Sequence, residues 1–245
     1  MKYLFLAGLA WMCLINRGHC QQQIVFNLSP SGYPPYMFQR DNGPAQGIIF
    51  DVLKVVADKY NYEIILVRLP KNREVLYLKS GDLDANALAK EWVKHPEDFE
   101  FTDVIVKARD VLLSLKRSPI KFNAAVDLHG KTIGVHLGYS YPLLADGFKQ
   151  GQIIKSNTNS ETAMLGKVLV ERTDAAVVNE WVGRWLIKEN PHWHGKFVVS
   201  KKEVGGFDYR IQFSRKWKGF VVKFNQELTR MKGDGRLKKI KARYK

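Results

Sequence analysis

The sequence predicts an α/β protein with mainly parallel sheets. Short apolar segments typical of strands alternate along the chain with amphipathic segments typical of helices. Of the 245 residues, 45% are hydrophobic and 12% aromatic, which excludes a disordered chain and is enough for one large domain or two smaller lobes. The only cysteines, Cys13 and Cys20, exclude a disulfide scaffold and a four-cysteine zinc site.

The first half of the chain contains four expected strands and two expected helices. Residues 24–28 are a short strand that ends at a turn-rich Ser-Pro-Ser-Gly segment. Residues 47–60 are a helix, because Ile48, Val52 and Val55 fall at i, i+4 and i+7 on one face. The remaining strands are expected at 62–67, 84–88 and 111–115, with a short helix at 73–79.

The second half repeats this alternation. Strands are expected at 132–135, 153–154 and 174–178, and helices at 141–148, 162–170 and 180–188. The clearest helical pattern runs from Trp217 to Met231, with Phe220 and Phe224 on its apolar stripe. The Gly-Asp-Gly segment at 233–235 ends this helix, and a second short stripe follows it.

Residues 1–20 are interpreted as a cleaved secretory signal. Lys2 precedes an apolar run over 3–15, and the small residues Gly18 and Cys20 stand at the expected cut. The run is short for a membrane span, so an uncleaved anchor is the weaker alternative. Cleavage after Cys20 lowers the formal charge from +15 to +13 and leaves no cysteine. Export predicts a soluble periplasmic protein and argues against nucleic acid as a partner.

The positive charge is concentrated near the C-terminus. Residues 206–245 contain thirteen Lys and Arg against three acidic residues, a net charge of +10. The rest of the predicted mature chain carries only +3. The basic segment is interpreted as a solvated face, and an acidic membrane or transporter contact is the alternative.

Several short motifs together resemble one family. They are Tyr33-Pro34-Pro35-Tyr36, the helix start at 47–51, the segments 78–84, 101–103 and 127–135, and the Gly-Asp-Gly at 233–235. In this order they resemble the bacterial extracellular solute-binding proteins of family 3, the periplasmic receptors of polar amino-acid ABC transporters. The resemblance runs from about Ile24 to the C-terminus.

The resemblance implies a two-lobed periplasmic-binding-protein fold of type II, in which two hinge strands join the lobes and a ligand is trapped between them. Each lobe would be a mixed, mainly parallel sheet flanked by helices. Lobe 1 would comprise residues 21–115 and 206–245, and lobe 2 residues 116–205. Residues 111–115 and 209–213 are the expected hinge strands. A receptor that closes by hinge motion is expected to act as a monomer and to deliver its ligand to a membrane permease.

The positions that hold an amino-acid ligand in the family differ in this chain. The arginine that pairs with the ligand α-carboxylate corresponds to His95, and the aspartate that holds the α-ammonium group corresponds to Asn179. Histidine cannot reproduce the planar fork and full charge of a guanidinium. An ordinary α-amino acid is therefore not the expected ligand.

Other residues are expected to line the ligand site. Tyr33 and Tyr36 follow the first strand, where the family places an aromatic side chain over the ligand. The remaining candidates follow later strands and are Arg73, Lys90, Trp92, Tyr139 and Ser140. Arg73, Lys90 and Ser140 suit an acidic or polar ligand, and the aromatic residues suit a ring. For Tyr36 a core position is the alternative, and for Arg73 a solvated one.

No enzyme, metal or cofactor motif is present in the sequence. His192 and His194 lack a nearby third ligand, and no nucleophile-elbow, zinc-protease or phosphate-loop pattern occurs. The expectation is a binding protein with no cofactor and no metal. Two alternatives remain: a dehydratase-like enzyme on the same fold with His95 or Glu180 as acid or base, and a ligand sensor that signals to a membrane receptor.

Overall fold

The computed structural model describes residues 21–30, 32–41 and 43–245. The predicted signal segment, with both cysteines, lies outside the described residues. A search of the described helices for one with the length and hydropathy of a membrane span found no such helix.

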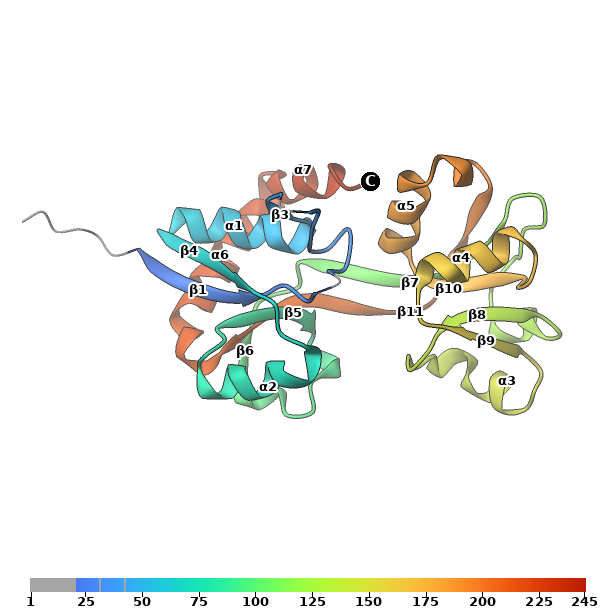
Figure 1. Ribbon diagram of the computed structural model, residues 1–245, viewed down its shortest axis with the longest axis horizontal. Coiled ribbons are helices and arrows are strands. Elements are labelled where there is room, and N and C mark those ends of the chain that lie inside the picture. Colours follow the sequence, from blue (N-terminus) through green and yellow to red (C-terminus); the bar gives the residue numbers. More distant parts are fainter. Residues whose placement is uncertain (1–20, 31, 42) are drawn as a thin grey trace, which may run out of the picture.

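The chain forms two α/β lobes joined by two long strands, β7 (Val106–Leu115) and β11 (Phe197–Ser214) (Figure 1). These strands run antiparallel. Phe197 pairs with Leu115 at the lobe 2 end, and Tyr209 pairs with Val106 at the lobe 1 end. They belong to one continuous sheet with the order β4-β1-β5-β11-β7-β10-β8-β9, and β6 pairs with β11. The two-lobed α/β fold expected from the sequence is thus confirmed.

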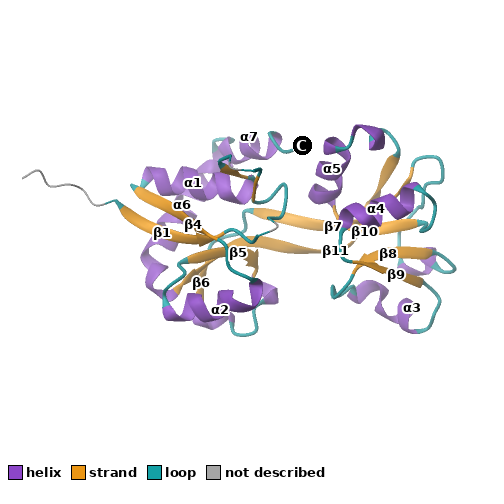
Figure 2. Ribbon diagram, in the orientation of Figure 1, coloured by secondary structure: helices purple, strands orange, loops and turns teal. Residues whose placement is uncertain are grey.

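Lobe 1 contains the N-terminal elements and the C-terminal helices (Figure 2). Its strands are β1 (Gln22–Asn27), β4 (Tyr62–Val67), β5 (Ala85–Ala89), β6 (Phe99–Phe101) and the small hairpin of β2 (Phe38–Gln39) and β3 (Ala45–Gln46). Its helices are α1 (Ile48–Lys59), α2 (Lys71–Ser80), α6 (Lys218–Gly233) and α7 (Arg236–Ala242). Strand β1 pairs parallel with both β4 and β5.

Lobe 2 contains the middle of the chain. Its strands are β8 (Thr132–His136), β9 (Ile154–Thr158) and β10 (Ala175–Asn179), and its helices are α3 (Ala145–Lys149), α4 (Glu161–Leu169) and α5 (Glu180–Glu189). Strand β8 pairs parallel with β9 and β10, and β10 pairs antiparallel with the hinge strand β7. Short 3₁₀ turns lie between these elements, for example Lys90–Trp92 in lobe 1 and Pro142–Leu144 in lobe 2.

The helices lie where the apolar patterns predict them because each buries one stripe. Ile48, Val52 and Val56 of α1 are fully buried, as are Phe224, Leu228 and Met231 of α6. Both stripes contribute to the largest hydrophobic core, in lobe 1. Two smaller cores cover the two faces of the lobe 2 sheet.

The hinge strand β11 is much longer than the sequence indicated. Only residues 209–213 were expected, because the Lys-Lys-Glu and Gly-Gly residues at 201–206 have the composition of a loop. Glu203, Gly205 and Gly206 nevertheless pair with β7, and register shifts between Val199 and Glu203 and between Glu203 and Gly205 absorb the unpaired residues. A Cβ at Gly206 would lie 2.5 Å from the Ala108 carbonyl oxygen, so the strands approach here because residue 206 is glycine. The lobe boundaries at 115/116 and 205/206 stay predictions.

Two smaller differences occur in lobe 2. Residues 141–148 were expected to be one short helix, but a 3₁₀ turn over Pro142–Leu144 precedes α3. The strand expected at 153–154 begins one residue later and continues to Thr158, because it pairs with all five residues of β8. Its polar sequence, Ile-Lys-Ser-Asn-Thr, carries no apolar alternation from which its length could be predicted.

Candidate functional site

Three tyrosine rings form a stack that leads from the first loop of lobe 1 to the hinge. Tyr36 is fully buried, and its ring lies 4.8 Å from that of Tyr209 on β11, nearly parallel at 9°. Tyr33 stacks on Tyr36 at 5.4 Å. Gly47 allows the loop to close, because its φ is +126° and a Cβ there would lie 2.4 Å from the Tyr36 carbonyl oxygen.

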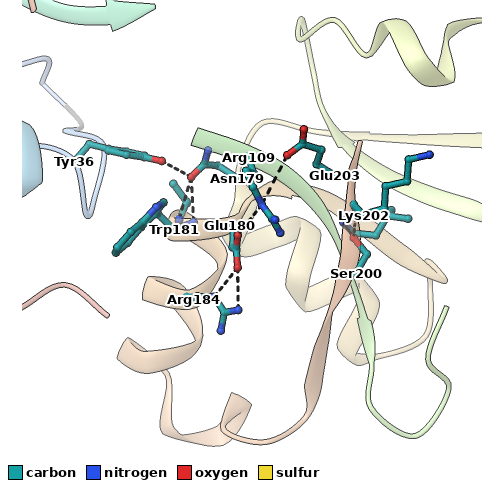
Figure 3. Close-up of polar contacts among 11 residues, drawn as sticks. Tyr36, Arg109, Asn179, Glu180, Trp181, Arg184, Ser200, Lys202 and Glu203 are labelled. Atoms are coloured by element: carbon teal, nitrogen blue, oxygen red, sulfur yellow. Dashed lines mark hydrogen bonds and ion pairs between the residues drawn. The ribbon is translucent and has the colours of Figure 1, made fainter. Parts of the chain in front are cut away.

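One hydrogen bond joins this stack to lobe 2. The Tyr36 hydroxyl donates to Asn179 Oδ1 at 2.6 Å (Figure 3). Asn179 ends β10 and caps α5, because the same oxygen accepts the backbone N–H groups of Trp181 and Val182 at 3.2 and 3.4 Å. Asn179, a predicted ligand residue, is therefore held in place by Tyr36 and by the first turn of its own helix.

Helix α5 contacts lobe 1 along its length. The Trp185 ring lies 5.2 Å from that of Phe38 in the β2 strand. Arg40 of lobe 1 pairs with Glu189, and the Lys188 ammonium donates to the C-terminal Lys245 carbonyl oxygen at 3.0 Å. In Figure 1 this helix lies beside the C-terminal end of α7. These contacts hold the two lobes together on the α5 side.

The loop after β8 presents a tyrosine from lobe 2. Tyr139 stacks on His136 at 4.1 Å and remains 51% exposed. The loop is fixed by Tyr141, whose hydroxyl oxygen accepts the backbone N–H of His136 at 2.9 Å. Burial raises the pKa of Tyr141 to about 12. Tyr139 therefore has a supported ring with an accessible face.

The charges of two carboxylates act on these tyrosines. Glu161 begins α4 in lobe 2, and its charge adds to the burial that raises the pKa of Tyr33 in lobe 1. It also raises the pKa of Tyr139. Asp110 lies on the hinge strand β7 and raises the pKa values of Tyr36 and Tyr139. The fields of both carboxylates thus reach residues of both lobes.

Asp110 occupies an environment that disfavours its charge. Burial raises the pKa of its carboxyl above the usual value, although the Asn179 amide opposes this shift. Nδ2 of Asn179 is buried and forms no hydrogen bond that meets the usual geometry with the described residues. The other charge that acts on Asp110 is Glu203, another carboxylate.

We call these eight residues the interlobe cluster: Tyr33, Tyr36 and Tyr209 from lobe 1 and its hinge strand, Asp110 from the other hinge strand, and Tyr139, Tyr141, Glu161 and Asn179 from lobe 2. Sequence inspection identified Tyr33, Tyr36, Tyr139 and Asn179 as candidates and missed the other four. Tyr209 and Tyr141 resemble core residues in the sequence. Asp110 lies within a strand, and Glu161 follows a Ser160 N-cap, where an acidic residue has a helix-capping explanation.

Trp92 lies next to the hinge end of the tyrosine stack. Its ring centroid is 4.6 Å from that of Phe207 and 6.4 Å from that of Tyr209, and the side chain is 52% exposed. It follows β5 in a 3₁₀ turn, as expected for a residue at the end of a lobe 1 strand.

The other predicted site residues lie outside the interlobe cluster. His95 is 57% exposed and contacts Glu97 at 3.2 Å. The Lys90 ammonium lies 5.6 Å from the centre of the Phe101 ring. Arg73 is exposed on α2, and Ser140 is exposed in the loop after β8. Their roles in ligand binding stay predictions.

The remaining polar groups near the hinge form ion pairs. Arg109 Nε lies 3.1 Å from Glu180 and 3.9 Å from Glu203, and Arg184 also pairs with Glu180 (Figure 3). Glu180, one residue considered for acid–base chemistry, is thus held between two arginines. No group of three or more potential metal ligands occurs within the described ranges.

Two surface hollows of about 450 and 490 Å³ lie in lobe 2, away from the interlobe cluster. Both include Leu115, at the lobe 2 end of β7. The first is lined mainly by Lys116, Arg117 and Lys196 around apolar atoms, and the second contains acidic and basic groups in similar number. No residue of the interlobe cluster lines either hollow.

Comparison with known proteins identifies relatives across nearly the whole chain. The arginine-binding extracellular protein ArtP of Bacillus subtilis is 27% identical over 216 residues, which cover 86% of this chain and 82% of that protein. A probable histidine-binding protein of Campylobacter jejuni is 28% identical over 206 residues, with 83% and 77% covered. A solved structure of an ancestral cationic amino acid solute-binding protein superposes with a TM-score of 0.74 at 18% identity, covering 91% of this chain and 95% of that one, which shows the shared fold.

The family model for bacterial extracellular solute-binding proteins, family 3, matches residues 27–245. The expected resemblance is thereby confirmed, and the named relatives are binding proteins rather than enzymes. The two-lobed fold and the hinge strands are those expected for this family, and the family match covers almost all of the described residues. The chain belongs to the family 3 bacterial extracellular solute-binding proteins.

Proposed function

We propose that the protein captures a small organic cation between its two lobes and delivers it to an ABC transporter. The observation that carries this proposal is that Asp110 and Glu161 act electrostatically on the cluster tyrosines and form no ion pair among the described residues, where the hinge arginines Arg109 and Arg184 pair with other carboxylates. In a chain of net charge +15, acidic side chains whose charges raise the pKa values of tyrosines in both lobes favour a positively charged ligand.

The aromatic residues support the same ligand class. Cations bind favourably over the faces of Trp and Tyr rings, and Trp92 and Tyr139 have large exposed fractions. For this reason we keep the prediction from the sequence that aromatic side chains contact the ligand. The anionic part is not kept, because Asp110 and Glu161 would repel an anion bound at the cluster tyrosines. The relatives support this choice, since one is an arginine-binding protein and another a probable histidine-binding protein.

Capture between the lobes requires that they separate and close again. The hinge strands β7 and β11 are the connections that would bend, and the contacts of α5 with lobe 1 are those that would break. Each of these contacts is small, so we expect opening to cost little free energy compared with unfolding.

A thermal-shift screen tests this function. Purified protein is heated with organic cations, anions and neutral solutes at matched ionic strength. A ligand at 100 times its dissociation constant stabilises the folded protein by about 2.7 kcal/mol, which corresponds to a rise in Tm of about 5–10 °C for a chain of this size. Stabilisation by cations supports the proposal. Stabilisation by anions alone would contradict it.

Export and oligomeric state belong to the same proposal. We infer that the signal segment is removed after Cys20 and that the mature periplasmic protein is a monomer. Intact-mass measurement of the exported protein gives the cleavage site, and light scattering gives the oligomeric state. A mature N-terminus other than Gln21, or a stable dimer, would contradict these two inferences respectively.

A further inference from the structure

We propose that lobe 2 carries a second binding site, for an anion with an apolar body, at the end of the hinge strands. The site is the surface hollow of about 450 Å³ lined by Leu115, Lys116, Arg117, Leu169, Gly195 and Lys196, which we call the basic hollow. Its volume is within the range of about 300–1,000 Å³ that small-molecule sites occupy. No residue of the interlobe cluster lines it, so this proposal is independent of the proposed function.

Two lysines stand opposite each other in the basic hollow. The antiparallel ladder of β7 and β11 ends with the pair of Leu115 and Phe197, so Lys116 and Lys196 are the next opposed residues. The backbone N–H of Lys116 donates to the Lys196 carbonyl oxygen at 2.8 Å, as expected for opposed residues. Opposed residues place their side chains on the same side of the ladder, with Cβ atoms about 4.5–5.5 Å apart.

These two ammonium groups have no counterion within the chain. Both side chains are exposed, and neither forms an ion pair or a hydrogen bond within the described part of the chain. Like charges that lie directly opposite each other in an antiparallel pair destabilise it. An anion bound between Lys116 and Lys196 would relieve this repulsion and accept charge-assisted hydrogen bonds from both.

Arg117 adds a third positive charge to the basic hollow. Its guanidinium pairs with Glu171, which does not line this hollow, and the two side chains are 66% and 62% exposed. Because an ion pair between exposed side chains is weak, an incoming anion would compete with it at little cost. Three cationic side chains and no acidic one therefore line the basic hollow.

The neighbouring hollow of about 490 Å³ lacks this imbalance of charge. It is lined by Lys121 and Lys131 but also by the carboxylates of Asp127, Glu171 and Asp174. Lys131 lies 3.7 Å from Asp174. The acidic side chains offset the cations there, which is why the anion is assigned to the basic hollow.

Leucine side chains give the basic hollow an apolar surface as well. Leu115 is 5% exposed and belongs to one of the two lobe 2 cores, and Leu169 at the end of α4 packs against the same core. A small inorganic anion would contact only the cations, whereas an anion with an apolar body would also cover the leucines. The ligand class that uses both is a carboxylate or phosphate on an apolar body, either a soluble organic acid or an acidic lipid.

Calorimetry of the purified protein with octanoate, acetate and octanamide tests the need for both features. Acetate has the charge alone and octanamide has the apolar body alone. We expect octanoate to bind at least about tenfold more tightly than either, because only octanoate uses the cations and the leucines together. Octanoate that binds no more tightly than acetate or octanamide, or that does not bind, would overturn the proposal.

Vesicles distinguish a lipid from a soluble acid. Cosedimentation with vesicles of phosphatidylglycerol but not of phosphatidylcholine, lost in Lys116→Gln/Lys196→Gln, would support the proposal with an acidic lipid as the ligand. Octanoate binding without this cosedimentation would support it with a soluble acid as the ligand. The double variant is needed in this comparison because residues 206–245 are also basic and could attract acidic vesicles by themselves.

Two matched double variants locate the octanoate site. Lys116→Gln/Lys196→Gln should weaken octanoate binding at least about tenfold and, because it removes the opposed charges, should not lower the Tm of the unliganded protein. Lys121→Gln/Lys149→Gln removes the same charge from two other exposed lysines of lobe 2, and its octanoate affinity should stay within about twofold of the wild type. Equal octanoate affinities of the two double variants would overturn the proposal.

Discussion

The Tyr36 hydroxyl donates a hydrogen bond of 2.6 Å to Asn179 Oδ1 and so connects the first loop of lobe 1 to the start of α5 in lobe 2. Both residues are buried, and the Tyr36 ring is stacked on both faces. We infer that this bond restrains the relative position of the lobes.

Replacement of Tyr36 by phenylalanine tests that restraint. Tyr36→Phe keeps the ring stack and removes the hydroxyl, so we expect a loss of about 1 kcal/mol and a fall in Tm of about 2–4 °C. Small-angle scattering should show a larger average radius. Tyr60→Phe removes an exposed hydroxyl that contacts the Lys223 carbonyl oxygen at 3.5 Å, and neither quantity should change. An unchanged scattering curve for Tyr36→Phe would exclude the restraint.

Removal of the exposed indole at position 92 is expected to weaken cation binding. The contribution of a cation–π contact is about 0.5–2 kcal/mol, so Trp92→Ala should reduce the affinity for the organic cation by about twofold to about thirtyfold. Trp92→Phe should restore part of it. Trp193→Ala, in the distant contact of Trp193 with Phe197 in lobe 2, is the control for loss of an indole. Equal affinities of the three variants would show that Trp92 does not contact the ligand.

Asp110 is expected to favour binding at the expense of stability. Burial raises its pKa, so its charged form destabilises the unliganded protein near neutral pH. Asp110→Asn should therefore raise the Tm of the unliganded protein and lower the affinity for the organic cation at least tenfold. A variant with lower stability and unchanged affinity would assign Asp110 a purely structural role.

The raised pKa of Asp110 also predicts how stability and binding depend on pH. The stability contributed by protonated Asp110 is fully present below the unfolded pKa, about 3.9, and is lost as the pH rises through the raised folded pKa. The Tm advantage of Asp110→Asn should therefore increase between about pH 4 and 7. Cation binding to the wild type should weaken as the pH falls through the same range.

A buried carboxylate in lobe 1 provides a prediction unrelated to the ligand. The Glu227 side chain is 1% exposed and contacts Lys59, Arg230 and Arg236, and its hydrogen bond from Lys59 is the main cause of its lowered pKa. Glu227→Gln should cost about 1.5–3 kcal/mol at neutral pH. Asp58→Asn, in the exposed pair with Lys54, should cost less than about 1 kcal/mol.

The lowered pKa of Glu227 predicts how the stability difference between wild type and Glu227→Gln changes with pH. Because the folded pKa is lowered, the stabilisation is present above the unfolded pKa of about 4.3 and is lost as the pH falls through the folded value. The difference in Tm between wild type and Glu227→Gln should therefore shrink in acid. A constant difference down to about pH 3 would mean that packing rather than charge is responsible.

The fold was largely predictable from sequence because its elements bury regular stripes. The apolar residues of α1 and α6 recur at helical spacing, and β4 was predicted with its observed bounds. The length of β11 was not predictable, because residues 201–206 favour a loop and only the pairing of Glu203, Gly205 and Gly206 with β7 continues the strand past them. Long-range pairing overrode local preference there.

The candidate site was less predictable for a related reason. Tyr33 and Tyr36 stand in a recognisable loop motif, but Asp110 and Glu161 lie 51 residues apart in unremarkable strand and helix positions. Only the folded arrangement brings their fields onto the same tyrosines. Arg73 and Lys90 suggested an anionic ligand in the sequence, and no local pattern indicated that carboxylates would dominate between the lobes.

The central claim is that carboxylates between the lobes bind a cationic ligand, and one titration tests it directly. Calorimetry with agmatine compares the wild type, the double variant Asp110→Asn/Glu161→Gln, and the control Asp58→Asn/Glu63→Gln, which has the same net charge as the double variant. The account predicts that the wild type and the control bind with affinities within about twofold of each other and that the double variant binds at least about a hundredfold more weakly, as expected for loss of two charge-assisted contacts. A double variant that binds agmatine as tightly as the wild type would contradict it.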